Sequence, residues 1–372
     1  MQPLRVVAIG HTGRGDYGHA IDELWTDAAD TKLIAVADPS PEGLEAASRR
    51  LGVKGYADWR TMLTEVEPEI VVICTRHLED HATMAIAAAE AGVKGIFMEK
   101  PFVRTPQEAD AVVAACEKSG TKLSVAFVNR HADTFARVRE MLDEGRIGRL
   151  LEMRARGKED ARGGGEDLWV LGGHLLDLMA NLGGPPQWCQ ATASLAGRPV
   201  TKADATEGPE GLGLIAGDRI DAMWGLADGI TGFFASVREA GRGQPAFGLT
   251  LVGTAGAIQI RPDQQPQAFL RRAPLWRVDR DIPWQPILPD GRLLENAAAA
   301  PRASREDRVA VRAGWGRRAA ADLVDAIREG REPETGMYAS RTVVEMTAAV
   351  YASSLSGERI DWPLAKRGNP LG

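Results

Sequence analysis

The amino-acid sequence predicts an α/β protein in which a doubly wound parallel sheet is followed by a mainly antiparallel sheet. Three observations predict this fold class. Short apolar runs alternate with helical patterns over the first third of the chain, a glycine-rich turn follows the first run, and later apolar runs succeed one another at hairpin-like intervals. Since 372 residues suffice for two domains, we expect one over residues 1–127 and a second over 128–372.

The first strand and its glycine turn indicate a nucleotide site. The apolar run Leu4–Ile9 is typical of a buried parallel strand, and it leads directly into Gly10-His11-Thr12-Gly13-Arg14-Gly15. In the dinucleotide fingerprint, Gly10 permits a tight turn, Gly15 permits close packing of a helix, and amides at the helix N-terminus receive a pyrophosphate. Thr12 stands at the middle glycine position, with Gly13 beside it, so the match is partial.

Asp38 predicts the choice of cofactor. It follows the second expected strand, 33–37, at about the separation of the acid that hydrogen-bonds an adenosine ribose. Because a carboxylate here repels a 2′-phosphate, we expect NAD in preference to NADP. The alternative is that Asp38 is the turn or helix-cap residue of segment 38–42, and the two roles are compatible.

Two further residues fall where the ligands of such sheets bind. The alternation continues through strands 69–75, 95–97 and 122–127 and helices 81–91 and 106–119. Thr75 and Lys100 both follow strands, and ligands bind beyond the carboxyl ends of strands. A lysine is usually a solvated surface residue, but Lys100 follows a buried strand beside the expected nucleotide site. We therefore expect Lys100 to have a chemical role.

Beyond residue 127 the pattern changes. Helices are expected at 132–144, from about 315 to 327, and at 339–355, and strands at 147–157, 219–226, 231–237, 247–253 and 254–260. Segment 158–165 is polar and glycine-rich, which suits a loop at the mouth of a site. Periodicity assigns no structure to 262–312.

Several motifs then occur together in one order. They are the glycine turn, Ile73-Cys74-Thr75 followed by His81, Glu99-Lys100-Pro101, Asn129-Arg130, and Gly172-Gly173-His174-Leu175-Leu176-Asp177. This ordered set resembles the Gfo/Idh/MocA family of glucose-fructose oxidoreductase, inositol dehydrogenase and their relatives. The resemblance implies a Rossmann domain, followed by an α+β domain whose large open sheet often mediates oligomerisation.

The resemblance also implies roles for site residues. Lys100 would orient the substrate hydroxyl and lower its pKa, and His174 would remove the hydroxyl proton as hydride leaves for nicotinamide. We expect the cofactor to be held by Gly10, Thr12, Gly13, Arg14, Gly15, Asp38, Thr75, His77, His81, Glu99 and Lys100. We expect the substrate to meet Arg130, Arg156, Lys158, Asp167, Trp169 and Asp177.

The surroundings of His174 depart from the family. Val170 stands where relatives commonly have an aspartate, which would hold the imidazole tautomer and raise its basicity. Asp167 or Glu166 can substitute if the backbone turns them inward, and Asp177 shares the helix face of His174 at the i, i+3 spacing. The alternative is that His174 is a satisfied interior residue of an apolar helix.

A second departure lies at the end of the third strand. Arg76-His77 replaces the usual Pro-Asn pair, which changes the contacts expected on the nicotinamide side. A positively charged Arg76 there suits a carboxylate or a phosphate.

Composition limits the other classes of function. A net charge of −6 argues against sequence-independent binding to nucleic acid. Three scattered cysteines give neither a disulfide framework nor a zinc pattern, and we expect no metal. Because the first strand begins within a few residues of the N-terminus and no run reaches membrane-spanning length, we expect a cytoplasmic enzyme with no membrane partner.

These observations predict an NAD-dependent oxidoreductase that acts on a sugar, cyclitol or glycoside, assembled as a homodimer or homotetramer through its C-terminal sheet. One alternative is a redox-neutral lyase or glycosidase, in which tightly bound NAD is reduced and regenerated within a cycle. Another is a degenerate, non-catalytic binding protein.

Overall fold

The computed structural model describes residues 2–26, 28–241, 247–277, 281–300 and 303–372. The chain forms two compact units. The first contains 1–127 together with 207–213 and 313–344, and the second contains 128–206, 214–312 and 345–372. The sequence predicted a single boundary after residue 127. That boundary puts 207–213 and 313–344 in the second domain, whereas the structure puts both segments in the first unit.

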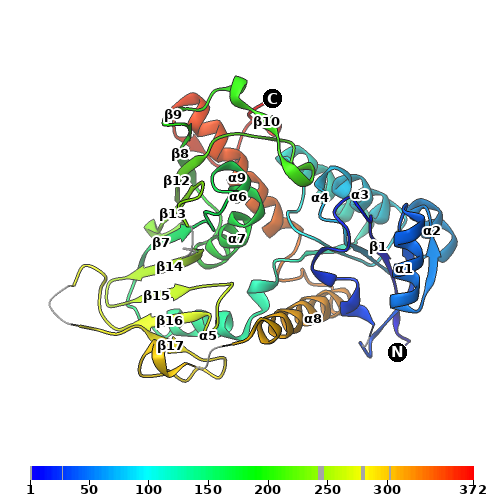
Figure 1. The fold of residues 1–372 in the computed structure, drawn as a ribbon, viewed down its shortest axis with the longest axis horizontal. Helices are drawn as coiled ribbons and strands as arrows, with labels where there is room; N and C mark the ends of the chain where they lie inside the picture. Colours follow the sequence, from blue (N-terminus) through cyan, green and yellow to red (C-terminus); the bar gives the residue numbers. More distant parts are fainter. Residues whose placement is uncertain (1, 27, 242–246, 278–280, 301–302) are drawn as a thin grey trace. The chain divides into compact units, whose positions relative to one another are not determined.

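The first unit is built on a six-stranded sheet of parallel strands (Figure 1). Its strand order is β3-β2-β1-β4-β5-β6. The chain adds β2 and β3 on one side of β1 and then β4, β5 and β6 on the other side, so the order in which strands are added switches between β1 and β4. The strands are β1 (Leu4–Ile9), β2 (Thr31–Ala37), β3 (Lys54–Tyr56), β4 (Ile70–Ile73), β5 (Gly95–Met98) and β6 (Lys122–Val125). Every residue of β4 and β5 is buried, as in the central strands of a sheet with covered faces. The predicted doubly wound sheet is confirmed.

Capping side chains mark the starts of three of the helices between these strands. They are α1 (Pro41–Leu51), α2 (Trp59–Val66), α3 (His81–Glu90) and α4 (Pro106–Ser119). Ser40, Asp58 and Thr105 each accept a hydrogen bond from an amide of the following first turn. Helix α8 (Arg305–Glu329) returns to this unit from late in the chain and packs on β5. The contact is close, since a Cβ added to Gly95 would lie 2.6 Å from Ile327 Cδ1.

The segment between β1 and β2 corrects one expectation. The sequence predicted a helix directly after the glycine turn, but the described part of 10–30 contains only two 3-10 turns, η1 (Gly18–Ala20) and η2 (Glu23–Trp25). The reason is the backbone: φ is positive at Gly13, Gly15, Asp16, His19 and Ala20. Because an α-helix does not continue through left-handed residues, the glycine turn leads into a loop and not into an α-helix N-terminus.

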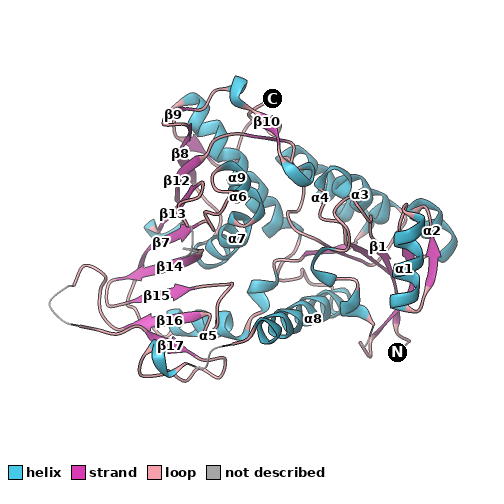
Figure 2. Cartoon of the chain, viewed as in Figure 1, coloured by secondary structure: helices cyan, strands magenta, loops and turns pink. Residues whose placement is uncertain are grey.

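The second unit is built on a ten-stranded, mainly antiparallel sheet (Figure 2). Its order is β17-β16-β15-β14-β7-β13-β12-β8-β18, with β9 beside β8. The strands are β7 (Leu150–Arg156), β8 (Trp188–Leu195), β9 (Arg198–Pro199), β12 (Arg219–Gly225), β13 (Thr231–Val237), β14 (Gly248–Gly253), β15 (Ala257–Ile260), β16 (Ala268–Arg271), β17 (Gln285–Ile287) and β18 (Ile360–Asp361). Only β7 and β13 pair in parallel among these described strands.

One face of this sheet is covered by α7 (Gly172–Gly183), with α5 (Asp133–Asp143) and α6 (Gly165–Val170) nearby in the chain. The contact is close, since a Cβ on Gly232 of β13 would lie 2.3 Å from Met179 Sδ. Alternate residues of β13 are buried and half-exposed. The sheet therefore has one buried and one more open face.

The remaining elements include the stretch left unassigned from sequence. Segment 262–312 contains β16, β17 and the start of α8, which begins about ten residues before the expected helix. The pair β10 (Thr206–Glu207) and β11 (Leu214–Ile215) flanks the turn η6 (Pro209–Gly211), and α9 (Met337–Ser356) follows α8.

Candidate active site

Lys100 lies at the ligand-binding edge of the parallel sheet. It follows β5, whose Met98 pairs with Ile73 of β4, and the Glu99 amide extends this ladder by donating to the Ile73 carbonyl at 2.9 Å. The Lys100 side chain is 6% exposed. The fold thus delivers a buried lysine to the carboxyl ends of the neighbouring strands β4 and β5, where such sheets bind ligands.

His81 fixes the turn that carries Lys100. Its Nε2 contacts the Thr75 carbonyl at 2.8 Å, and its Nδ1 contacts the Pro101 and Phe102 carbonyls, each at 3.1 Å. The ring is fully buried. With both ring nitrogens on backbone carbonyls, His81 joins the segments that follow β4 and β5, and its expected contact with the cofactor stays a prediction.

Glu99 is a buried carboxylate with two partners. His19 Nδ1 lies 2.7 Å from Oε1, and the Lys100 amide donates to Oε2 at 2.9 Å. Burial raises the pKa of Glu99, but His19 and Lys100 oppose it more strongly and hold the pKa below its ordinary value. The carboxylate therefore stays ionised at neutral pH and anchors the main chain at Lys100.

The glycine segment packs directly on the end of β4. A Cβ on Gly15 would lie 2.4 Å from Thr75 Oγ1 and 2.5 Å from the His77 nitrogen. Thr75 Oγ1 donates to the Arg14 carbonyl at 2.8 Å, and the Arg76 amide donates to the Gly15 carbonyl at 3.1 Å. Glycine is required at position 15 because no side chain fits between the two segments.

Arg14 and His77 are held by their neighbours in this segment. The Arg14 guanidinium pairs with Glu79 and, at 2.8 Å, with Asp80. Burial and Arg14 lower the pKa of His77, so its ring is neutral at pH 7. The structure thus gives Arg14 two internal carboxylates, whereas the sequence suggested a cofactor contact.

Asp38 follows β2 as predicted, and its carboxylate binds the glycine segment. It accepts hydrogen bonds from Thr12 Oγ1 at 2.7 Å, from the Thr12 amide at 3.0 Å and from the Ser40 amide at 2.9 Å. Burial and Asp38 together raise the pKa of Tyr17, which lies against Gly10. Asp38 therefore makes the turn contacts of the alternative interpretation while Ser40 caps α1, and its contact with a ribose stays a prediction compatible with them.

A cleft of about 220 Å³ opens at the carboxyl ends of β1 and β2. It is lined by residues from three strand ends and from α2 and α3: Ile9, Gly10, His11, Ala37, Asp38, Pro39, Ala57, Asp58, Trp59, Arg60, Asp80 and Met84. Arg60 stacks on Trp59, with 4.1 Å between its Cζ and the ring centroid. A flat aromatic wall beside a buried carboxylate fits the adenosine half of a dinucleotide.

In the second unit, His174 lies on α7 with Asp177 one turn later. His174 is buried, and Asp177 forms a buried ion pair with Arg130 of η4 (Val128–His131) at 3.1 Å. Two residues expected to meet substrate therefore bind each other. Lys100 and His174, the predicted catalytic pair, come from different units.

Asp167 is turned inward, but toward the sheet. Its Oδ2 accepts from Ser236 Oγ at 2.6 Å and from the Glu159 amide at 3.2 Å. Burial raises the pKa of Asp167, against the opposing effect of these hydrogen bonds. Glu159 in turn pairs with Arg156 at 2.9 Å. These contacts fix loop 158–165 to β13, which is the role the structure gives to Asp167 and Arg156.

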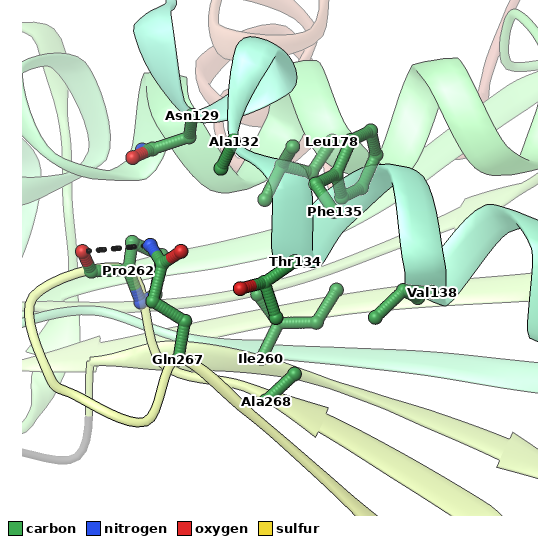
Figure 3. Close-up of a pocket in the computed structure, with 10 residues that line it drawn as sticks. All are labelled: Asn129, Ala132, Thr134, Phe135, Val138, Leu178, Ile260, Pro262, Gln267 and Ala268. Atoms are coloured by element: carbon green, nitrogen blue, oxygen red, sulfur yellow. Dashed lines mark hydrogen bonds between the residues drawn. The ribbon is translucent and has the colours of Figure 1, made fainter. Parts of the chain in front are cut away.

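The other expected substrate residues differ in exposure. Trp169 of α6 is buried, and Lys158 is half-exposed in the loop. A cavity between α5, α7 and the strands β15 and β16 has a volume of only about 10 Å³ and is lined by Phe135, Val138 and Leu178 among others (Figure 3). It holds at most one water, so it is a packing defect and not a substrate site.

The described residues lack two kinds of feature. They contain no cluster of three or more histidine, cysteine or acidic residues that could hold a metal ion. No described helix is both long and apolar enough to cross a bilayer.

Comparison with known proteins decides the family. Residues 4–127 match the family described as oxidoreductases with an NAD-binding Rossmann fold, and residues 135–259 match the Gfo/Idh/MocA C-terminal domain. The chain belongs to the Gfo/Idh/MocA oxidoreductase family. The resemblance noted from its motifs is confirmed, and so are the enzyme class and NAD as the cofactor.

Individual members of the Gfo/Idh/MocA family align over most of the chain. Levoglucosan dehydrogenase of Pseudarthrobacter phenanthrenivorans is 30% identical over 264 residues, which are 63% of this chain and 67% of that protein. A putative UDP-kanosamine synthase oxidoreductase subunit of Amycolatopsis mediterranei is 28% identical over 71% of this chain and 78% of its own. The structure of a levoglucosan dehydrogenase complex with NADH and L-sorbose superposes with a TM-score of 0.74, at 23% identity, over 98% of this chain and all of that chain.

Sequence reasoning missed three side chains of the first unit. His19 has no motif of its own, and only its spacing from the glycine turn signals that it reaches Glu99. Trp59 and Arg60 follow the Asp58 cap, and their adjacency is the only local sign of the stacked pair in the cleft.

Proposed function

We propose that this chain is a dehydrogenase that moves hydride between NAD and a hydroxyl-bearing carbon of a sugar, cyclitol or glycoside. The observation that carries the proposal is the buried amine of Lys100 at the end of β5, next to the strand that receives the glycine segment. The sugar-type substrate is supported by relatives such as levoglucosan dehydrogenase.

Lys100 acts on the substrate hydroxyl in this proposal. Its ammonium donates a hydrogen bond to the hydroxyl oxygen, and it stabilises the negative charge that develops there as the proton leaves. NAD supplies the acceptor for the hydride that departs from the same carbon. His174 takes the hydroxyl proton, so that one C–H and one O–H bond break and one carbonyl forms.

Residues near His174 position it. Val170 supplies no carboxylate, and Asp167 is used by Ser236 and the Glu159 amide. Asp177 also lies on the His174 face of α7, one turn later, and it is paired with Arg130. We infer that this buried pair holds the α7 surface rigid beneath the imidazole.

The cofactor is held by the loop and cleft of the first unit. Amides of 12–15 would receive the pyrophosphate, and Trp59 with Asp38 would border the adenosine. Asp38 already accepts three hydrogen bonds, so a ribose hydroxyl would take the remaining acceptor position of the carboxylate or replace Thr12 there.

Assembly and location complete the proposal. The more open face of the ten-stranded sheet suits a homodimer or homotetramer, and we place the enzyme in the cytoplasm. Sedimentation of the purified chain tests the first statement, and fractionation of its host cells tests the second.

A substrate panel tests the proposed reaction. Polyols, monosaccharides and glycosides are incubated with NAD, and both NADH absorbance and product mass are recorded. A dehydrogenase gives NADH and a product two mass units lighter. Turnover with no NADH and no change in oxidation state contradicts the proposal and favours the redox-neutral alternative.

A further inference from the structure

Arg76 lies at the same edge of the parallel sheet as Lys100. It follows β4 by three residues, Lys100 follows β5 by two, and the last residues of these strands, Ile73 and Met98, are paired. The two cations therefore leave neighbouring strands at the end where ligands bind.

The stem of Arg76 is held in place. A Cβ on Gly18 would lie 2.7 Å from Cγ of Arg76 and 2.7 Å from Cγ of Glu99. Only a glycine at position 18 lets the two stems lie side by side. Arg76 is thus packed next to the residue that directly precedes Lys100, and less side-chain freedom is lost when its head group binds.

The guanidinium of Arg76 is weakly paired. Its nearest carboxylate is Glu210, with 3.4 Å between NH2 and Oε1, and both side chains are more than a third exposed. Within the described chain, Arg76 Nε is buried without a hydrogen-bond partner. Arg104, by contrast, binds Glu108 through Nε at 2.9 Å and NH2 at 2.6 Å. An exposed pair as long as that of Arg76 adds little stability, so another anion can displace it cheaply.

The contact with Glu210 shows that a carboxylate fits beside the Arg76 guanidinium. Glu210 lies on η6, in the returning segment 207–213 that belongs to the first unit, and it brings a carboxylate to Arg76. A planar guanidinium binds a carboxylate through two parallel hydrogen bonds when the approach is open. Among the described residues, the ion pair with Glu210 uses NH2 of Arg76 alone, so the head group is incompletely used.

We propose that Arg76 binds a carboxylate of the substrate in place of Glu210, and that this enzyme acts on sugar acids in preference to neutral sugars. The inference rests on the proposed function, because it names the substrate class of the same site. Lys100 and Arg76 then divide the work: one meets the reacting hydroxyl, and the other fixes the acid group.

Paired ligands test this directly. With NADH present, calorimetry compares D-glucuronate with D-glucose, D-galacturonate with D-galactose, and D-gluconate with D-sorbitol. We expect at least one acid to bind about tenfold tighter than its neutral partner. Arg76→Gln should weaken that acid about 10- to 100-fold and leave the neutral sugar unchanged, Arg76→Lys should fall between, and Glu210→Gln should tighten the acid a few-fold.

Controls separate this inference from the proposed function. Arg104→Gln removes a well-paired arginine of the same unit and should change neither ligand class. No acid preference in the wild type, equal effects of Arg76→Gln on acids and neutral sugars, or tighter binding of glucose 6-phosphate than of any acid would overturn the inference. Acid binding that depends on Arg76, without NADH formation from any substrate, supports the inference while contradicting the proposed function.

Discussion

At the scale of single residues, Lys100 depends on groups that surround its backbone. His81 ties the flanking carbonyls together, and Glu99 holds the Lys100 amide while its other oxygen contacts His19 Nδ1. A buried carboxylate such as Glu99 is tolerated only because it is paired. The neighbours of Lys100 thus fix the position of its main chain.

Glu99→Gln should destabilise the protein in a pH-dependent way. The folded-state pKa of Glu99 is below its ordinary value of 4.5, so its ionisation stabilises the fold above that pH and the benefit is lost as pH falls through the lower folded value. We expect a loss of about 1–3 kcal/mol at pH 7 that stays nearly constant down to about pH 5 and shrinks as pH falls below the ordinary value of 4.5. Urea unfolding of both proteins from about pH 7 to about pH 3 measures it, and a difference that does not shrink below pH 4.5 would contradict the assignment.

Asp167→Asn should show the opposite trend. The pKa of Asp167 is raised above 3.8, so the charged form is disfavoured in the folded state and stability falls as pH rises through the folded pKa. The asparagine oxygen can still accept from Ser236. The variant should therefore gain stability relative to wild type between about pH 4 and pH 7, and a relative loss over that range in the same urea series would refute this.

At the scale of elements, the glycine segment joins two parts of the sheet. It binds Asp38 after β2 through Thr12 and packs Gly15 on Thr75 after β4. The segment therefore spans the switch point between β1 and β4 without an α-helix. Its shape is set by left-handed residues, which the glycines allow.

Gly15→Ala and Gly13→Ala form a matched pair. Both positions have positive φ, +85° and +81°, so each substitution adds backbone strain of about 1 kcal/mol. Only at position 15 does a Cβ meet other atoms, with Thr75 Oγ1 at 2.4 Å, whereas nothing lies within 4 Å at position 13. Gly15→Ala should cost at least 2 kcal/mol more, on the order of a core overpacking. Equal melting temperatures for the two variants would rule out this close packing.

The sequence predicted elements where one local signal dominates. Helix α4 and strand β13 match the expected ranges because Thr105-Pro106 marks the start of the helix and a turn at Ala227–Gly229 precedes the strand. The prediction of a helix after Gly15 was wrong, because the sequence alone does not distinguish a glycine of the dinucleotide fingerprint from a glycine of a left-handed loop. The pairs Arg130 with Asp177 and His19 with Glu99 join residues 47 and 80 positions apart, and no local pattern encodes such partners.

At the scale of the whole molecule, chain order and compact units differ. Segments 207–213 and 313–344 return to the first unit, where α8 packs on Gly95 and Glu210 reaches Arg76. The first unit thus receives part of its core and one charged residue of its ligand edge from the second half of the chain. Sequence periodicity carries no information about such returns.

The central claim, that Lys100 carries catalysis, has one most direct test. The rate of NADH formation with the best substrate of the panel is measured for wild type and Lys100→Met, and NAD affinity is measured on the same samples. Lys94→Met, which alters an exposed lysine paired with Glu69, serves as the control. We expect Lys100→Met to lose about 10²- to 10³-fold or more in kcat with NAD affinity unchanged. Comparable rates for Lys100→Met and wild type would contradict the account.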